Sequence, residues 1–300
     1  MPNIKLSDIL FVMYALTILS LAFIISPTHD YVLYFKHWDL VLSGGDPWMK
    51  IPAPNAYGPI HNLFAFPYAL HSQLPKLIFV SCWLFISIYT VRTFSNTKNS
   101  SRNKLLYSFF WLVNPFFIVS SIAYGFNDNL VALLIFVGIL QAEKNKTITA
   151  LVIFSIGVLT KIYPIFLLPF LSKNWKDIRR NILIFFILFI AAYAISYLIW
   201  GGSFINAFGK ANGRSPTLFS IMMFINGDYF PFDTIAKALI AINALLVLSG
   251  VLYAFHLYKA EKIEQHTSFL VGFTFLLLFY KAGQQQFYLA YFAIFAAWVI

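Results

Sequence analysis

The sequence predicts an all-α polytopic membrane protein, and three observations lead to this fold class. Of the 300 residues 60% are hydrophobic and only 11% are charged, whereas a soluble domain carries about 25% charged residues. Apolar runs close to the ~20 residues that cross a ~30 Å hydrocarbon core recur along the chain. These runs are continuous and do not alternate with polar residues, which favours helices over a barrel. We expect one domain, residues 1–300, with about eight to ten transmembrane segments.

The basic residues set the orientation of these segments. The chain has a net charge of +10, but its Lys and Arg residues gather in short loops between apolar runs. That distribution is typical of cytoplasmic loops and gives no reason to expect a nucleic-acid partner. Cys82 is the single cysteine, which excludes an intrachain disulfide and a cysteine-based metal site.

The first run, Ile9–Ile25, is expected to be a retained helix, because no small-residue cleavage site follows it. A first outer loop, residues 27–76, comes next. Within it Ile60–Leu70 is too short to cross, and prolines interrupt it. Leu77–Phe94 is a full-length span. If both runs crossed, the basic loop after Phe94 would lie outside, so we expect Ile60–Leu70 to lie at the interface.

Leu105–Ala123 then crosses outward, residues 125–129 form an outer turn, and Leu130–Leu140 returns. The following stretch, Ile148–Leu171, has basic residues on both flanks. Because both flanks should be cytoplasmic, this stretch is predicted to be a broken hairpin with Lys161–Pro164 at its tip.

In the last third, Ile182–Trp200 crosses outward into a second outer loop, residues 201–232. Ile235–Tyr258 returns, Leu270–Tyr280 crosses again, and residues 281–286 form an outer turn. A short apolar run reaches the last residue without a polar tail, so we expect the natural protein to continue beyond it.

This topology places several polar residues at the outer end of the bundle. They are Asp30, Tyr57, Asp128, Lys161 and Lys281. A carboxylate or an ammonium beside so much hydrocarbon is costly, which makes a functional role the first hypothesis.

Asp30 is the candidate general base. A carboxylate beside a dry pocket can take a proton from a substrate hydroxyl. Asp30 also starts a segment with helical apolar spacing, so a simple helix cap is the alternative. The same alternative applies to Asp128. Asp39 and Asp46 are weaker candidates, and turn chemistry accounts for Asp46.

Lys161 and Lys281 are candidates to bind a phosphate, and Arg214 could join them from the second outer loop. For Lys161 the alternative is a side chain that reaches back to the membrane surface. His29, His37 and His61 share the first outer loop, but their spacing matches no known zinc pattern.

Several short motifs follow one another in a recognisable order. They are Thr28-His29-Asp30-Tyr31, Gly44-Gly45-Asp46-Pro47-Trp48, Tyr57-Gly58-Pro59, Asn114-Pro115, Ser120-Ser121, Gly125 with Asp128, Lys161-Ile162-Tyr163-Pro164, and Lys281 followed by Gln286-Phe287-Tyr288. In the order and spacing of these motifs the chain resembles the GT-C class of integral-membrane glycosyltransferases. It is most similar to the mannosyltransferase that adds the first mannose in glycosylphosphatidylinositol assembly, and to its bacterial relatives. Thr28 stands where that family has the first Asp of an acidic pair, which weakens the case for a metal bridged by two carboxylates.

The resemblance implies an inverting transfer of a hexose, mannose favoured, from a polyprenyl-phosphate donor to a hydroxyl of a glycan or glycolipid. The reaction would occur on the non-cytoplasmic side of a bacterial or archaeal cell membrane, or of the endoplasmic reticulum in a eukaryote. Asp30 would be the base. The donor and its phosphate would contact a further set of residues: Lys161, Tyr163, Lys281, Gln286, Tyr57, Asp128 and Arg214. No cofactor is implied beyond an optional divalent metal, and the sequence has no Gly-rich phosphate loop.

Two other functions fit part of the pattern. A transporter or flippase of lipid-linked sugars also uses broken helices and intramembrane charges, but it places them near the membrane midplane and not at one face. A polymerase or ligase of surface polysaccharide would share the outer-loop chemistry.

Overall fold

A computed structural model describes residues 6–26, 28, 30–49, 55–96, 101–212, 233–279 and 286–300. In these ranges the chain is helical and has no strand. The elements are α1 (Leu6–Ile24), α2 (Asp30–Leu42), α3 (Pro59–Asn62), α4 (Ala65–Leu70), α5 (Leu74–Ser95), α6 (Ser101–Val113), α7 (Pro115–Ile118), the π-helix η1 (Val119–Ala123), α8 (Asp128–Glu143), α9 (Thr147–Thr160), the 3₁₀-helix η2 (Tyr163–Leu171), α10 (Trp175–Trp200), the 3₁₀-helix η3 (Gly202–Phe204), α11 (Ile205–Asn212), α13 (Asp233–Lys259), α14 (Gln265–Phe279) and α15 (Phe287–Val299).

Within the described ranges, five helical segments are long and apolar enough to cross a membrane. They are Leu6–Ile24, Leu74–Ser95, Ser101–Ala123, Trp175–Trp200 and Ala241–Lys259. Shorter apolar helices, α9, α14 and α15, lie beside them. Large apolar side chains along α1 and α10 are exposed, as expected for surfaces that face lipid. The protein is therefore an all-α, multi-pass integral membrane protein, as the sequence predicts.

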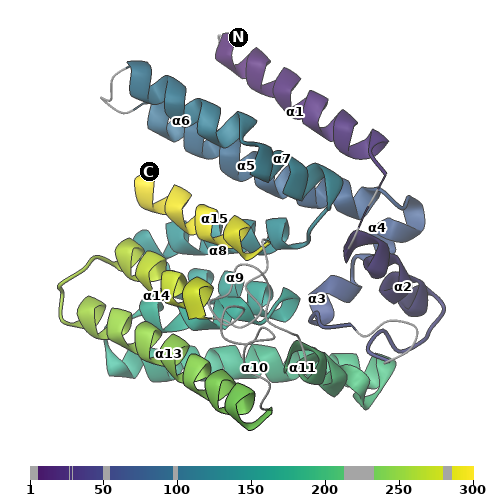
Figure 1. Ribbon diagram of the computed structural model, residues 1–300, viewed down its shortest axis with the longest axis vertical. Coiled ribbons are helices and arrows are strands. Elements are labelled where there is room, and N and C mark those ends of the chain that lie inside the picture. Colours follow the sequence, from purple (N-terminus) through teal and green to yellow (C-terminus); the bar gives the residue numbers. More distant parts are fainter. Residues whose placement is uncertain are drawn as a thin grey trace.

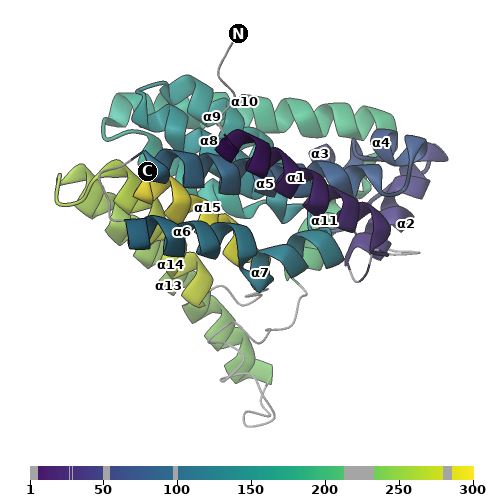
Figure 2. The same cartoon turned by 90° about the horizontal axis from the view of Figure 1, so that it is seen from above.

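The long helices lie side by side, and the short helices α2, α3 and α4 gather at one end of them, on the right in Figure 1. Helix α8 is central, because it packs against α5, α9 and α15. Helix α13 pairs with α14 and slants away from the other long helices (Figure 2). The buried aromatic and aliphatic side chains of α8, α9, η2, α14 and α15 form the main core.

Two sequence predictions about interrupted segments are confirmed. The run Ile60–Leu70 is split into α3 and α4, each too short to cross a membrane. The stretch Ile148–Leu171 breaks after Thr160, and η2 packs back against α9. At the end of η2 the Phe170 carbonyl accepts a hydrogen bond from Gln265 Nε2 at 2.8 Å. His266, which follows Gln265, lies 3.9 Å from Glu143 at the end of α8. The end of η2 is therefore close to the turn between α8 and α9.

Exposed ion pairs mark the end of the bundle opposite the short helices. Asp8 pairs with Arg92 at 2.6 Å, and Lys173 pairs with Glu261 at 3.1 Å. Both pairs join segments that the positive-inside distribution assigns to the cytoplasmic side. We therefore call the end that carries α2, α3 and α4 the outer end.

Candidate active site

The break after α9 brings the first outer loop onto the bundle. Pro164 has no N–H and its ring would clash with the carbonyl four residues earlier, so the helix ends at Thr160. The freed Thr160 carbonyl accepts a hydrogen bond from the Gly58 N–H at 3.0 Å. A Cβ at Gly58 would overlap the Leu159 carbonyl oxygen. Glycine therefore allows the loop backbone to touch the end of α9, beside Lys161.

Lys161 and Asp128 form a buried ion pair at the outer end. The distance between Lys161 Nζ and Asp128 Oδ2 is 2.5 Å, and the two side chains are 7% and 0% exposed. The other carboxylate oxygen accepts a hydrogen bond from the Tyr163 hydroxyl at 3.2 Å. The Lys161 ammonium also lies 4.9 Å from the centre of the Tyr57 ring, within cation–π range. Four residues named from the sequence, Tyr57, Asp128, Lys161 and Tyr163, are thus in one connected cluster.

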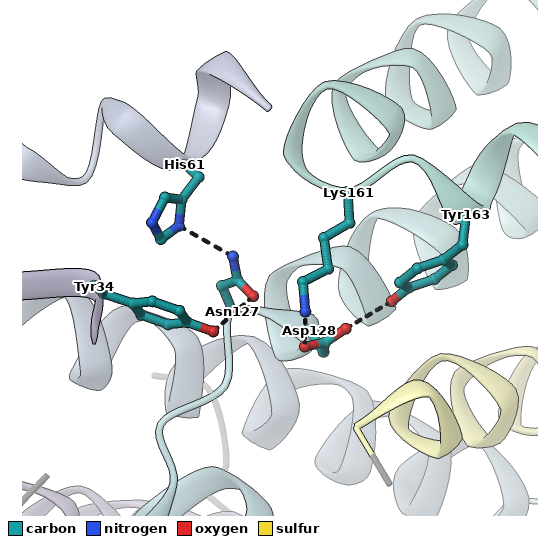
Figure 3. A network of polar contacts seen from close by, with 6 residues as sticks. All are labelled: Tyr34, His61, Asn127, Asp128, Lys161 and Tyr163. Atoms are coloured by element: carbon teal, nitrogen blue, oxygen red, sulfur yellow. Dashed lines mark hydrogen bonds and ion pairs between the residues drawn. The ribbon is translucent and has the colours of Figure 1, made fainter. Parts of the chain in front are cut away.

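A second set of hydrogen bonds, between neutral side chains, lies beside this pair and connects Asn127 to α2 and α3 (Figure 3). The Tyr34 hydroxyl donates to Asn127 Oδ1, and Asn127 Nδ2 lies 3.1 Å from His61 Nδ1. Because the Asn127 oxygen already accepts from Tyr34, its amide N–H groups point to His61, whose Nδ1 is therefore the acceptor. Burial lowers the pKa of His61 well below its usual value, and the neighbouring His37 and Lys161 lower it further. His61 is thus neutral, with its proton on Nε2.

Asp30 and Asp128 lie near the same tyrosine. Asp30 is the first residue of α2, is partly exposed, and lies one helical turn before Tyr34. Burial raises the pKa of Tyr34 well above its usual value, and the nearby Tyr57, Asp30 and Asp128 raise it further. Both carboxylates are therefore close enough to Tyr34 to act on its charge. Asp30 begins α2 and Asp128 begins α8, both at the outer end of the bundle, and the role of Asp30 as a base stays a prediction.

Of the remaining donor-binding candidates, Gln286 is within the described residues. Gln286 is buried immediately before α15, and the next residue, Phe287, packs on the Tyr163 ring with centroids 4.9 Å apart. Gln286 is thus beside the cluster. Lys281 and Arg214 lie outside the described residues.

The acidic residues that were weaker candidates have different surroundings. Asp39 is exposed on α2, and burial together with this nearby carboxylate raises the pKa of Tyr68. The Asp46 carboxylate accepts from the Trp48 N–H at 2.9 Å, which is the expected turn chemistry.

Among the described residues, the candidate histidines of the first outer loop are not part of a metal site. His37 and His61 are buried with ring centroids 5.9 Å apart, and His29 lies outside the described residues. Over the ranges that the structure describes, no three His, Cys, Asp or Glu side chains converge to hold a metal ion.

The sequence patterns do not single out Tyr34 and Asn127, and they suggest His61 only as a metal ligand. Tyr34 could have been found from the spacing of α2, because it lies one turn after Asp30 and shares its face. Asn127 directly precedes Asp128, but nothing in its sequence context shows that its side chain links α2 to α3.

A bundle of membrane-spanning helices with carboxylates, a lysine and tyrosines gathered at one end is consistent with a membrane enzyme of the GT-C glycosyltransferase type. The family comparison agrees, since the model of glycosyltransferase family 87 matches residues 55–280. The chain belongs to this family. No solved structure matches it.

Proposed function

We propose that this glycosyltransferase moves a hexose, with mannose favoured, from a polyprenyl-phosphate donor to an acceptor hydroxyl on the non-cytoplasmic side, with inversion. The main support for this proposal is that the two carboxylates near Tyr34 differ in burial and in hydrogen bonding. Asp128 is fully buried and bonded to Lys161 and Tyr163, whereas Asp30 is partly exposed at the start of α2.

This difference assigns a separate role to each carboxylate. A general base must reach the acceptor hydroxyl and must be able to take its proton. Asp30 meets the first condition, because an acceptor can approach it from the outer surface. Asp128 instead holds Lys161 and Tyr163 in place and keeps the Lys161 charge balanced. We assign Asp30 as the base and Asp128 as a residue that positions Lys161.

In the proposed reaction the acceptor oxygen attacks the anomeric carbon while Asp30 takes its proton. The bond between that carbon and the phosphate oxygen breaks on the opposite face, and the electron pair stays on the phosphate. The phosphodiester thereby becomes a lipid phosphomonoester with additional negative charge. Cationic and hydrogen-bonding groups that stabilise this charge lower the barrier.

The residues around Lys161 would contact the donor. Lys161 donates a hydrogen bond to Asp128, and its positive charge would attract the phosphate of the donor. Tyr57, Tyr163 and Gln286 line the same region and would contact the sugar or the lipid phosphate. Lys281 and Arg214 remain proposed donor-binding residues on sequence grounds.

Purified protein in phosphatidylcholine nanodiscs, incubated with radiolabelled polyprenyl-phosphate sugars and with nucleotide sugars, tests the donor class. We expect label to pass to a glycan or glycolipid acceptor from the lipid donor, with mannose transferred fastest and with the opposite anomeric configuration in the product. Transfer from the nucleotide sugars alone, or retention of configuration, would contradict the proposal.

A further inference from the structure

A second buried lysine lies at the outer end, and its charge has no described carboxylate partner. Lys76 is in the first turn of α5 and is 0% exposed. Its Nζ donates to the Ile25 carbonyl at 2.7 Å. An ammonium has three N–H donors, so this bond leaves others available.

Lys76 differs from Lys161 in that no described carboxylate balances its charge. Lys161 is neutralised by Asp128 at 2.5 Å. No ion pair within the described residues includes Lys76. Of the 11 acidic residues of the chain, only Asp228 and Asp233 have side chains outside the description. A buried cation without a counter-charge costs several kcal/mol, and an ionisable residue in a membrane protein is therefore a functional candidate.

The position of Lys76 ties it to Asp30. The Lys76 backbone N–H donates to the Tyr31 hydroxyl at 2.8 Å, and that hydroxyl donates to the Ser72 carbonyl at 3.0 Å. Ile25 and Tyr31, which both bond to Lys76, lie on either side of Asp30 in the chain. The Lys76 ammonium is thus held at the end of α1, and its backbone N–H is held by Tyr31, the residue after the proposed base.

The same lysine also contacts the outer turn that leads to Asp128. Gly125 has a left-handed backbone, with φ of +58°, and a Cβ there would lie 2.9 Å from the Tyr31 ring and 3.1 Å from Lys76 Cγ. Three residues further along the chain is Asp128. Lys76 therefore lies between the Asp30 segment and the turn before the Asp128–Lys161 pair.

We propose that the Lys76 ammonium is a binding group for the phosphate of the lipid-linked donor, separate from Lys161. This inference rests on the proposed function. The ligand class is a phosphate ester on an isoprenoid chain, whose negative charge supplies a counter-ion for Lys76. As the sugar leaves, the phosphate gains charge, and the contact strengthens.

A purely structural role is the alternative, because a lysine that bonds to the last carbonyls of a helix stabilises its C-terminus. The two roles separate in a binding measurement. A helix cap affects the stability of the free protein and leaves lipid-phosphate affinity unchanged. A phosphate ligand affects the affinity for polyprenyl phosphate in protein that remains folded.

The test measures binding of sugar-free decaprenyl phosphate to the full chain in phosphatidylcholine nanodiscs. We expect Lys76→Met and Lys76→Gln to weaken binding at least tenfold and Lys76→Arg to stay within threefold of the parent. Lys173→Met is the matched control, since Lys173 lies at the opposite end in an exposed ion pair, and it should bind normally. Normal binding by folded Lys76→Met would overturn the proposal. If neither uncharged variant folds, Lys76→Arg decides, and a loss above tenfold would overturn it.

Binding and competition with other ligands show which kind of phosphate the site recognises. Uncharged decaprenol should bind at least tenfold more weakly than decaprenyl phosphate to the parent and equally to parent and Lys76→Met. Inorganic phosphate and phosphatidylglycerol should compete poorly. Competition by phosphatidylglycerol as strong as that of decaprenyl phosphate would overturn the donor assignment and indicate a general lipid-headgroup site. The binding assay does not depend on sugar transfer. If binding depends on Lys76 but the protein transfers no sugar, the proposed function is contradicted and the phosphate site at Lys76 is not.

Discussion

Removing the lysine of the buried pair should destabilise the protein strongly. The perturbation is Lys161→Met, which leaves the Asp128 carboxylate without its ammonium at a position that is 0% exposed. Breaking a buried ion pair from one side costs about 3–5 kcal/mol, which is about 10²–10⁴ in the unfolding equilibrium constant. The Tyr163 hydrogen bond remains, but one neutral donor does not replace the opposite charge.

Replacing both partners should recover most of this loss. In Lys161→Met/Asp128→Leu neither charge of the pair is left buried, and well-packed apolar residues often equal or exceed a buried pair in stability. The double variant should therefore be more stable than Lys161→Met alone. It should nevertheless be inactive if the pair helps to bind the donor.

Equilibrium unfolding in mixed detergent micelles, followed by tryptophan fluorescence, measures these differences. Lys173→Met is the reference, because the Lys173–Glu261 pair is 41% and 78% exposed and such pairs contribute about 0–1 kcal/mol. If Lys161→Met costs no more than Lys173→Met, or if the effects of the two substitutions at the buried pair simply add, the pair does not stabilise the fold as an ion pair.

Three further predictions concern the topology and the outer end. With the native cysteine removed, Lys144→Cys should react with an impermeant maleimide only from the cytoplasmic side and Asp46→Cys only from outside, and the reverse pattern would exclude the proposed orientation. Gly58→Ala should lower thermal stability and activity together, because its Cβ would overlap a backbone oxygen of α9, and parental values for both would show that the loop does not need this contact. His61→Leu should lose about 1–3 kcal/mol by leaving the Asn127 amide unpaired, whereas His61→Asn keeps an acceptor, and equal losses would argue against the hydrogen bond. Because the folded state lowers the pKa of His61 below its ordinary 6.5, its stabilising contribution is present above about pH 6.5 and is lost as the pH falls, a loss that His61→Asn should lack in thermal melts.

The interrupted hairpin is predictable from the sequence because its causes are local. Pro164 ends α9 by its own chemistry, and basic residues on both flanks fix both ends on one side. The same charge distribution places Asp128 and Lys161 at one end of the bundle. It does not show that they pair, because residues 33 positions apart meet only when α8 and α9 pack side by side.

The burial of Lys76 could not be predicted from the sequence. A lysine near the start of a membrane helix usually lies at the water surface, and by sequence alone Lys76 only marks the edge of the first outer loop. Its burial depends on the end of α1, the Tyr31 side chain and the Gly125 turn, which come from three separate parts of the chain. The Tyr34–Asn127–His61 network depends in the same way on tertiary packing and not on any local pattern.

The activity of Asp30→Asn shows whether Asp30 is the general base. Asn and Asp cap helices almost equally well, so the substitution keeps the start of α2 and removes only the ability to take a proton. With labelled polyprenyl-phosphate sugar, single-turnover transfer should fall by about 10²–10⁴ while binding of decaprenyl phosphate stays unchanged. Asp39→Asn, exposed on the same helix, should transfer at the parental rate. An Asp30→Asn protein as active as its parent would contradict the account and leave Asp128 as the remaining candidate for the base.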